Sequence, residues 1–205
     1  MPRSLVNCSD CPHGRRVSRR TLLKSLIGAA GAGLVLADSA ATAPKKKDDP
    51  RRLPPQAGDE LVYPFWENDG RLITLDDIPL GGPPVLAYPR DAASQVARDR
   101  SRLNQILLVR FAQQELSPKT RQVAVEGIIA YSGVCTHTGC NISEWDAEQQ
   151  HFVCPCHSSA FDPKDRARIH GGPAPKPLPV LPLQLVGGSL SVAGPFSGRV
   201  GGKRT

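Results

Sequence analysis

The chain has 205 residues, with 26 Lys and Arg against 19 Asp and Glu, and its sequence pI is about 9.3. The excess of positive charge lies at the start, because residues 1–52 hold 11 Lys and Arg and 4 Asp and Glu, whereas residues 53–205 hold 15 of each. The larger part is therefore neutral, which excludes a basic face for nucleic acid. Roughly 150 residues remain for a globular part, enough for one hydrophobic core.

The first element in chain order is a short polar leader, residues 1–17, which contains a C-x-x-C pair, Cys8 and Cys11. Such a pair can bind metal or act in redox chemistry, but a short polar leader has little structure to hold ligands, and the sequence assigns it no role. Residues 18–43 follow, with Arg19 and Arg20 ahead of an uncharged run rich in Ala, Gly and Leu. This pattern is typical of a twin-arginine export signal. We predict a bacterial inner-membrane protein whose domain lies on the periplasmic side.

Two fates of this segment stay open. Its uncharged core is shorter than the roughly 20 residues that span a bilayer, and it reaches that length only by continuing past Asp38 to Ala43. Small residues at the end of the segment suit a signal peptidase, although Pro44 disfavours a cut directly after Ala43. The segment is therefore either a cleaved signal or an uncleaved anchor helix.

Residues 44–58 are rich in Pro, Lys and Asp, which predicts an extended linker. The domain, residues 59–205, contains short apolar or β-branched stretches between Gly, Pro and Asp clusters, the pattern of an all-β fold. Gly187-Gly188 predicts a hairpin, and the charged segment 92–100 is either a short helix or a solvated insertion. The predicted strands are 72–75, 85–88, 105–111, 123–132, 151–153, 180–186 and 190–193.

Two segments of the domain combine cysteine and histidine: C-T-H-T-G-C at 135–140 and C-P-C-H-S-S at 154–159. Each offers a thiolate and an imidazole that two loops could direct at neighbouring metal ions. Two thiolates on one iron and two imidazoles on the other are the ligand set of a Rieske [2Fe-2S] centre. A zinc site with the same four ligands is the alternative, but it leaves the second cysteine of each loop without a role. The predicted ligands are Cys135, His137, Cys154 and His157.

These motifs resemble the iron-sulfur subunit family of quinol–cytochrome c oxidoreductases, whose loops read C-T-H-x-G-C and C-P-C-H-G-S. The resemblance implies a Rieske-type antiparallel β-sandwich with the two cluster-binding loops at one end, and it favours the uncleaved anchor helix. It also implies a disulfide between Cys140 and Cys156, and a hydrogen bond from Ser159 to a bridging sulfide. Residues 171–175, Gly-Gly-Pro-Ala-Pro, are similar to the loop that covers the cluster in that family.

Two residues depart from the family pattern. Ser158 stands in place of a glycine, and Phe161 stands in place of a tyrosine that donates a hydrogen bond to the ligand sulfur of Cys135. The run Phe161-Asp162-Pro163 is also similar to the Rieske small subunit of arsenite oxidase. The sequence is therefore similar to subunits of two families of redox complex.

The ligand set has a direct electrostatic consequence. Two neutral imidazoles in place of two thiolates leave the oxidised cluster near zero charge, so adding an electron is easier and the potential rises to roughly −150 to +300 mV. The resemblance places a ligand histidine against quinol at the tip of the domain. We expect His157 to be that contact, with His137 beside it.

The resemblance thus predicts an electron-transfer subunit that takes single electrons from quinol and passes them to a cytochrome, in company with cytochrome b and cytochrome c subunits. The alternative is the small Rieske subunit of a periplasmic molybdenum oxidase with a large molybdenum-containing partner. A ring-hydroxylating oxygenase needs a further iron domain, and too little sequence follows Ala193 to hold one. With one one-electron centre, the chain is not expected to be catalytic alone.

Four further residues are given no part in this chemistry. We expect His151 and His170 to be exposed residues that do not ligate metal. We expect Trp66 and Trp145 to pack in the core or under loops.

Overall fold

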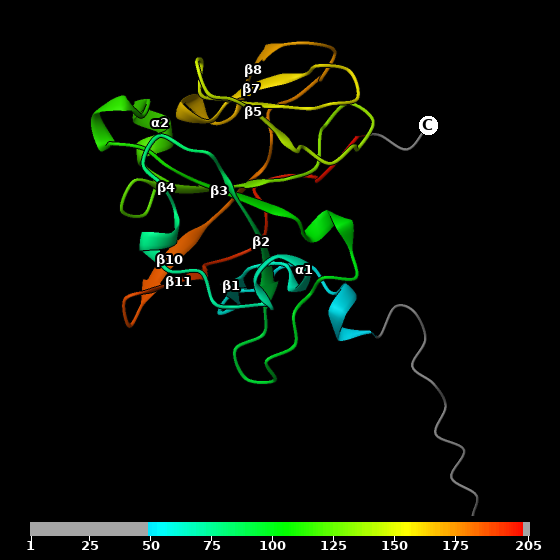
Figure 1. The fold of residues 1–205 in the computed structure, drawn as a ribbon, viewed down its shortest axis with the longest axis vertical. Coiled ribbons are helices and arrows are strands. Elements are labelled where there is room, and N and C mark those ends of the chain that lie inside the picture. Colours follow the sequence, from blue (N-terminus) through cyan, green and yellow to red (C-terminus); the bar gives the residue numbers. More distant parts are fainter. Residues whose placement is uncertain (1–48, 203–205) are drawn as a thin grey trace, which may run out of the picture. The chain divides into compact units, whose positions relative to one another are not determined.

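The computed structural model describes residues 49–202 of the chain. The leader and the export signal, with its proposed anchor helix, lie outside these residues, as does the start of the predicted linker. Within them, short strands and loops predominate over a few short helices, as the all-β prediction requires (Figure 1). No helix in 49–202 is both long enough and apolar enough to span a bilayer. The two α-helices are α1 (Phe65–Asn68) and α2 (Pro118–Arg121).

Seven strands form an antiparallel sheet in the order β10-β11-β1-β2-β3-β4-β9. The strands at its two ends, β9 and β10, are separated in sequence only by Pro182, so the sheet curls until its edges approach each other. Pro182 has no N–H for a ladder, which suits the change of edge. The strands are β1 (Glu60–Val62), β2 (Val85–Arg90), β3 (Ile106–Arg110), β4 (Ile128–Ser132), β9 (Val180–Leu181), β10 (Leu183–Val186) and β11 (Ser189–Val192).

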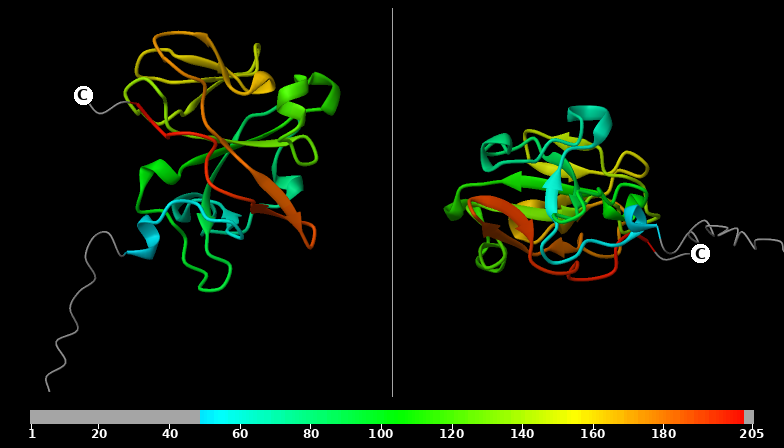
Figure 2. Two further views of the ribbon diagram at one scale, coloured as in Figure 1. Left: turned by 180° about the vertical axis from the view of Figure 1, so that it is seen from behind. Right: turned by 90° about the horizontal axis from the view of Figure 1, so that it is seen from below.

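A second sheet of four antiparallel strands has the order β5-β6-β7-β8. It forms the upper part of the molecule in Figure 1 and in the reverse view on the left of Figure 2. Its strands are β5 (Glu144–Asp146), β6 (His151–Val153), β7 (Ala160–Asp162) and β8 (Arg168–Gly171).

The central strands β3 and β4 are buried on both faces. Successive side chains of a strand point to opposite faces, so on β3 Ile106 and Leu108 join the core inside the large sheet, whereas Leu107 and Val109 join the core under the small sheet. Tyr131 of β4 contacts Phe152 of β6 edge to face, with ring centroids 5.8 Å apart. The small sheet therefore packs on the outer face of β3 and β4.

Most predicted strands are confirmed, with three changes of extent. The predicted strand 180–186 is divided at Pro182 into β9 and β10. The predicted strand 123–132 is reduced to β4, because Glu126 and Gly127 adopt positive φ values of 52° and 77° ahead of it. The stretch 72–75 contributes only a bridge from Leu72 to Val62 before a 3-10 turn begins at Leu75. The Gly187-Gly188 hairpin is confirmed by the pairing of β10 with β11. Prediction missed β1, β5, β7 and β8, which are only three or four residues long.

The helix predicted near 92–100 is wrong. Asp91 accepts hydrogen bonds from the backbone N–H and hydroxyl of Ser94, and this local bonding favours a turn over a helix. The alternative, a solvated insertion, holds only in part, since residues 92–95 are exposed. Arg98 is buried and donates to both carboxylate oxygens of buried Asp59, at 2.7 and 2.9 Å.

The described part of the predicted linker, residues 49–58, is held against the domain rather than extended away from it. Arg51 donates to Asp99 at 2.7 Å, and the side chain of Asn104 donates to the carbonyl of Leu53 at 2.7 Å. The charge-rich composition indicated solvation, but the partners of these residues lie about fifty positions away in sequence, where composition gives no sign of them.

Replacing Arg98 with methionine should destabilise the protein strongly, because it leaves the buried Asp59 carboxylate without its partner. Breaking a buried pair costs about 3 kcal/mol, which lowers the thermal midpoint by roughly 6–12 °C in a chain of this size. Circular dichroism melts measure this directly. Arg100→Met, in a half-exposed ion pair with Asp49, is the matched control and should shift the midpoint by at most about 2 °C. Equal shifts in the two variants would contradict a special role for the buried pair.

Candidate metal centre

The two cysteine-histidine segments are loops of the same geometry at one end of the small sheet. In the first loop, the N–H of Cys135 donates to the carbonyl of Cys140 at 2.8 Å, and the N–H of Gly139 donates back to the carbonyl of Cys135 at 3.1 Å. In the second loop, Cys154 pairs in the same two ways with Ser159 and Ser158, both at 2.9 Å. Each loop therefore closes on its first cysteine.

The fifth residue of each loop is left-handed, which explains why the sequence pattern prefers glycine there. Gly139 has φ 83°, and Ser158 has φ 54°. Glycine adopts this conformation freely, whereas a side chain costs about 1 kcal/mol. The departure at Ser158 thus carries a local strain without changing the course of the loop.

Two free thiols lie buried under the loops. Cys135 and Cys154 are each 1% exposed and belong to the core cluster that includes Phe152 and Phe161. Burial raises the pKa of the Cys135 thiol, and the neighbouring Cys154 adds to this, whereas hydrogen bonds from the His137 backbone and the Ser159 side chain oppose it. Thiolates at this site therefore require a strong positive partner such as a metal ion.

The two histidines of the loops lie next to each other. The rings of His137 and His157 lie 4.7 Å apart, centroid to centroid, and are nearly perpendicular. The Nδ1 atom of His137 is buried with no hydrogen-bond partner among the described residues, whereas His157 is exposed. A buried polar atom without a partner is uncommon, and coordination to a metal would satisfy this one.

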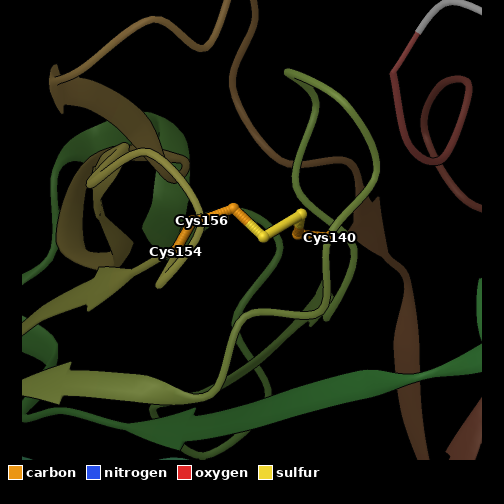
Figure 3. Close-up of side chains that lie close together, drawn as sticks. All are labelled: Cys140, Cys154 and Cys156. Carbon is orange, nitrogen blue, oxygen red and sulfur yellow. A yellow bond between two sulfur atoms is a disulfide. The ribbon is translucent and has the colours of Figure 1, made fainter.

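Cys140 and Cys156 form a disulfide that joins the loops, as predicted, with Cα atoms 6.5 Å apart (Figure 3). Among the described residues, one group of three ligand atoms lies within 4.8 Å, and it comprises Cys140, Cys154 and Cys156. Two of these sulfurs are consumed in the disulfide, so only Cys154 offers a thiolate. The candidate ligand set is therefore two cysteines and two histidines, rather than this sulfur trio.

The proline-rich loop predicted at 171–175 packs on both ligand loops. The N–H of Ala174 donates to the Ser159 hydroxyl at 3.2 Å, and a Cβ at Gly172 would lie 2.5 Å from the Cα of Ser159. On the other side, the Thr136 hydroxyl donates to the carbonyl of Lys176 at 2.6 Å. Backbone and hydroxyl contacts thus fix this loop beside the predicted ligands.

The contact between the C-terminal tail and the first ligand loop was not predicted from the sequence. Gly202 packs so closely on the first loop that a Cβ would lie 2.1 Å from the carbonyl oxygen of His137. Arg102 also donates to the carbonyl of Gly139 at 2.6 Å. No motif marks this tail, and only the close approach at Gly202 explains the need for glycine there.

His151 and Trp66 differ from the prediction in their exposure. His151 lies in β6 and is buried at 8% exposure, with its ring 4.3 Å from that of His170. Trp66 is 69% exposed and touches only the edge of Tyr88 among aromatic rings. Trp145 packs on Phe152 as expected, and His170 is exposed.

Comparison with known proteins identifies the family of this domain. A model of the Rieske [2Fe-2S] domain matches residues 90–182. The chain is 30% identical over 167 residues to the cytochrome bc1 complex Rieske iron-sulfur subunit of Streptomyces lividans, covering 74% of this chain and 95% of that protein. It is 29% identical over 203 residues to the subunit of the same name in Streptomyces coelicolor, covering 91% of this chain and 52% of that one.

A relative of another name has a higher identity over a shorter stretch. It is the putative respiratory nitrate reductase subunit Rieske of Haloferax mediterranei, 44% identical over 97 residues, covering 46% of this chain and 43% of that one. The chain thus spans about half the length of two of these relatives. Among solved structures, the soluble domain of Rieske protein II from Sulfolobus acidocaldarius aligns at 26% identity with a TM-score of 0.36, covering 49% of this chain and 68% of that one.

Replacing Cys140 and Cys156 together with alanine should lower stability, because the disulfide joins two loops across a sequence separation of 16. A closed loop of that length is worth about 3 kcal/mol, or roughly 6–12 °C in the thermal midpoint. The wild type melted in strong reductant is the control and should lose a similar amount. A double variant with the same thermal midpoint as the oxidised wild type would show that the disulfide contributes little to stability.

Proposed function

The chain belongs to the Rieske [2Fe-2S] family, and from that premise we propose that it is the iron-sulfur subunit of a quinol–cytochrome c reductase-like complex. The observation that carries this proposal is that two loops of the same geometry, joined by a disulfide, each supply one buried free cysteine and one of two neighbouring histidine rings. The names of the Streptomyces relatives support the type of complex.

The domain binds a [2Fe-2S] cluster, which accepts and returns one electron at a potential of roughly −150 to +300 mV. We assign Cys135 and Cys154 to one iron, and His137 and His157 to the other. The buried Nδ1 of His137 without a partner and the buried free thiols fit this assignment. Ser159 supports it, because its hydroxyl accepts a hydrogen bond from the covering loop and its side chain lowers the pKa of the Cys135 thiol against the effect of burial.

The exposure of His157 supports its role as the contact with quinol. An imidazole that uses one ring nitrogen as a ligand keeps the other as an N–H donor. At the surface, that N–H is open to a hydroxyl of the substrate, whereas the thiols lie beneath the loops and away from water. His157 would therefore hold and release a proton as the electron is transferred.

The location and the partners of the protein follow from the same proposed function. We propose export by the twin-arginine route, retention at the inner membrane by residues 18–43, and cytochrome b and cytochrome c subunits as partners. The disulfide supports an oxidising compartment such as the periplasm, since disulfides are rare in the cytosol. The twin-arginine route carries folded proteins, which suits a domain loaded with its cluster beforehand.

A second candidate is the small Rieske subunit of a molybdenum oxidase that resembles arsenite oxidase. Phe161-Asp162-Pro163 favours it, and the Haloferax relative is named as a subunit of a redox complex other than cytochrome bc1. Affinity purification of the tagged chain from its own membranes would separate the two. Recovery of cytochromes b and c supports the first function, and recovery of a large molybdenum protein supports the second.

The purified chain should contain iron and acid-labile sulfide in equal amounts, about two of each, and should give a rhombic EPR signal with low average g after dithionite reduction. The signal arises from the unequal ligands of the two irons. Cys154→Ala should abolish it, while Cys8→Ala, in the N-terminal leader, should leave it unchanged. Zinc in place of iron and sulfide would refute the proposed cluster.

Phe161→Tyr should raise the potential of the centre, because a phenol hydrogen bond to the Cys135 sulfur stabilises the reduced and more negative state. A hydrogen bond of about 1 kcal/mol corresponds to roughly 40 mV for one electron. Protein-film voltammetry gives the value. Phe111→Tyr adds the same hydroxyl to another buried phenyl in this core cluster and should leave the potential unchanged. An unchanged or lowered potential in Phe161→Tyr would contradict the argument.

A further inference from the structure

Three basic side chains near the first ligand loop have no ion-pair partner among residues 49–202: Arg166, Lys176 and Arg199. Many other cations of this part are paired, such as Arg98 with Asp59 and Arg168 with Asp165. Unpaired cations that gather in one place mark a surface available to an anionic partner.

The three cations line one cavity of about 540 Å³. It lies between the segment Pro175–Val180 and the C-terminal tail at 197–201, and no carboxylate lines it. Its surface is largely apolar, supplied by prolines and Leu178, with the positive charges around it. Such a lining suits a ligand that combines carboxylates with apolar groups.

A second cavity of about 820 Å³ lies across the tail from the first. Arg199 and Gly201 line both cavities, Arg102 adds a further cation to the second, and again no carboxylate is present. We call this surface, with Arg102, Arg166, Lys176 and Arg199, the cationic flank. Together the two cavities are far larger than a single small anion requires.

The cationic flank is built from fixed backbone. The N–H of Val180 donates to the Ser197 hydroxyl at 2.9 Å, and the N–H of Ser197 donates to the carbonyl of Val180 at 2.8 Å. These bonds attach the tail to the proline-rich segment. A surface already ordered loses little entropy when a partner binds.

The cationic flank also includes residues of the first ligand loop. Thr136 lines the first cavity and stands between Cys135 and His137 in the chain, while Thr138 and Gly139 line the second cavity. A partner seated here would therefore contact the backbone of the first ligand loop.

We propose that the cationic flank docks a carboxylate-rich surface of a partner protein. The size of the paired cavities favours a protein surface over an isolated ion, and the apolar proline lining favours it over a simple charge contact. This proposal rests on the proposed function in one respect: the partner is the protein that gives an electron to the cluster or takes one from it. Its position beside the first ligand loop would shorten the path of transfer.

The test uses the full-length, cluster-loaded protein and a fluorescein-labelled hexaglutamate peptide with one leucine as probe, measured by fluorescence anisotropy. Wild type should bind the probe, and the affinity should fall as salt is added. Lys176→Gln with Arg199→Gln removes two exposed cations from the flank and should weaken binding roughly tenfold. Lys119→Gln with Arg121→Gln removes the same charge from α2 and should change binding less than twofold.

Two parallel titrations distinguish other anions: inorganic phosphate, and vesicles of phosphatidylglycerol. Equal weakening in both double variants, no binding of the peptide, or binding of phosphate or vesicles alone would each overturn the inference. An EPR spectrum of every sample separates this outcome from failure of the proposed function. Loss of peptide affinity with an intact signal concerns the flank, whereas absence of the signal in wild type concerns the cluster.

Discussion

The burial of β3 and β4 on both faces is the constraint on which the rest of the structure depends. One face closes the core of the large sheet, and the other supports the small sheet through Tyr131 and Phe152. Because the ligand loops extend from β4 and from the β6–β7 connection, this packing decides where both loops begin and end. The metal-binding end of the molecule is therefore held by apolar contacts beneath it rather than by the loops themselves.

Above that support, the loops stabilise each other by polar and covalent contacts. Each closes on its own first cysteine, the disulfide joins them, and the proline-rich loop bonds to Thr136 and Ser159. A site held by so many contacts limits reorganisation when an electron is gained or lost. The left-handed Ser158 is a local cost that these surrounding contacts outweigh.

Charge is divided between two uses in the described part of the chain. At the base, the buried Arg98–Asp59 pair and the contacts of Arg51 join the segment before β1 to the 91–104 loop. Near the ligand loops, basic side chains are left unpaired on the cationic flank. The buried pair fixes where the domain begins, and the unpaired side chains leave a surface for recognition. A neutral total therefore conceals a strongly uneven distribution.

The type of metal cluster, the disulfide pair and the all-β class were predictable from sequence, because a cluster and a disulfide need particular side chains in recognisable motifs and strands need local alternation. Long-range partners were not predictable. The burial of His151, the partner of Arg98 and the passage of Gly202 over the first ligand loop each depend on residues distant in the chain. Local pattern carries no information about such contacts, since they arise only when the sheets pack. Sequence alone thus determined the chemistry of the centre, and tertiary structure decided its supports and the surface beside it.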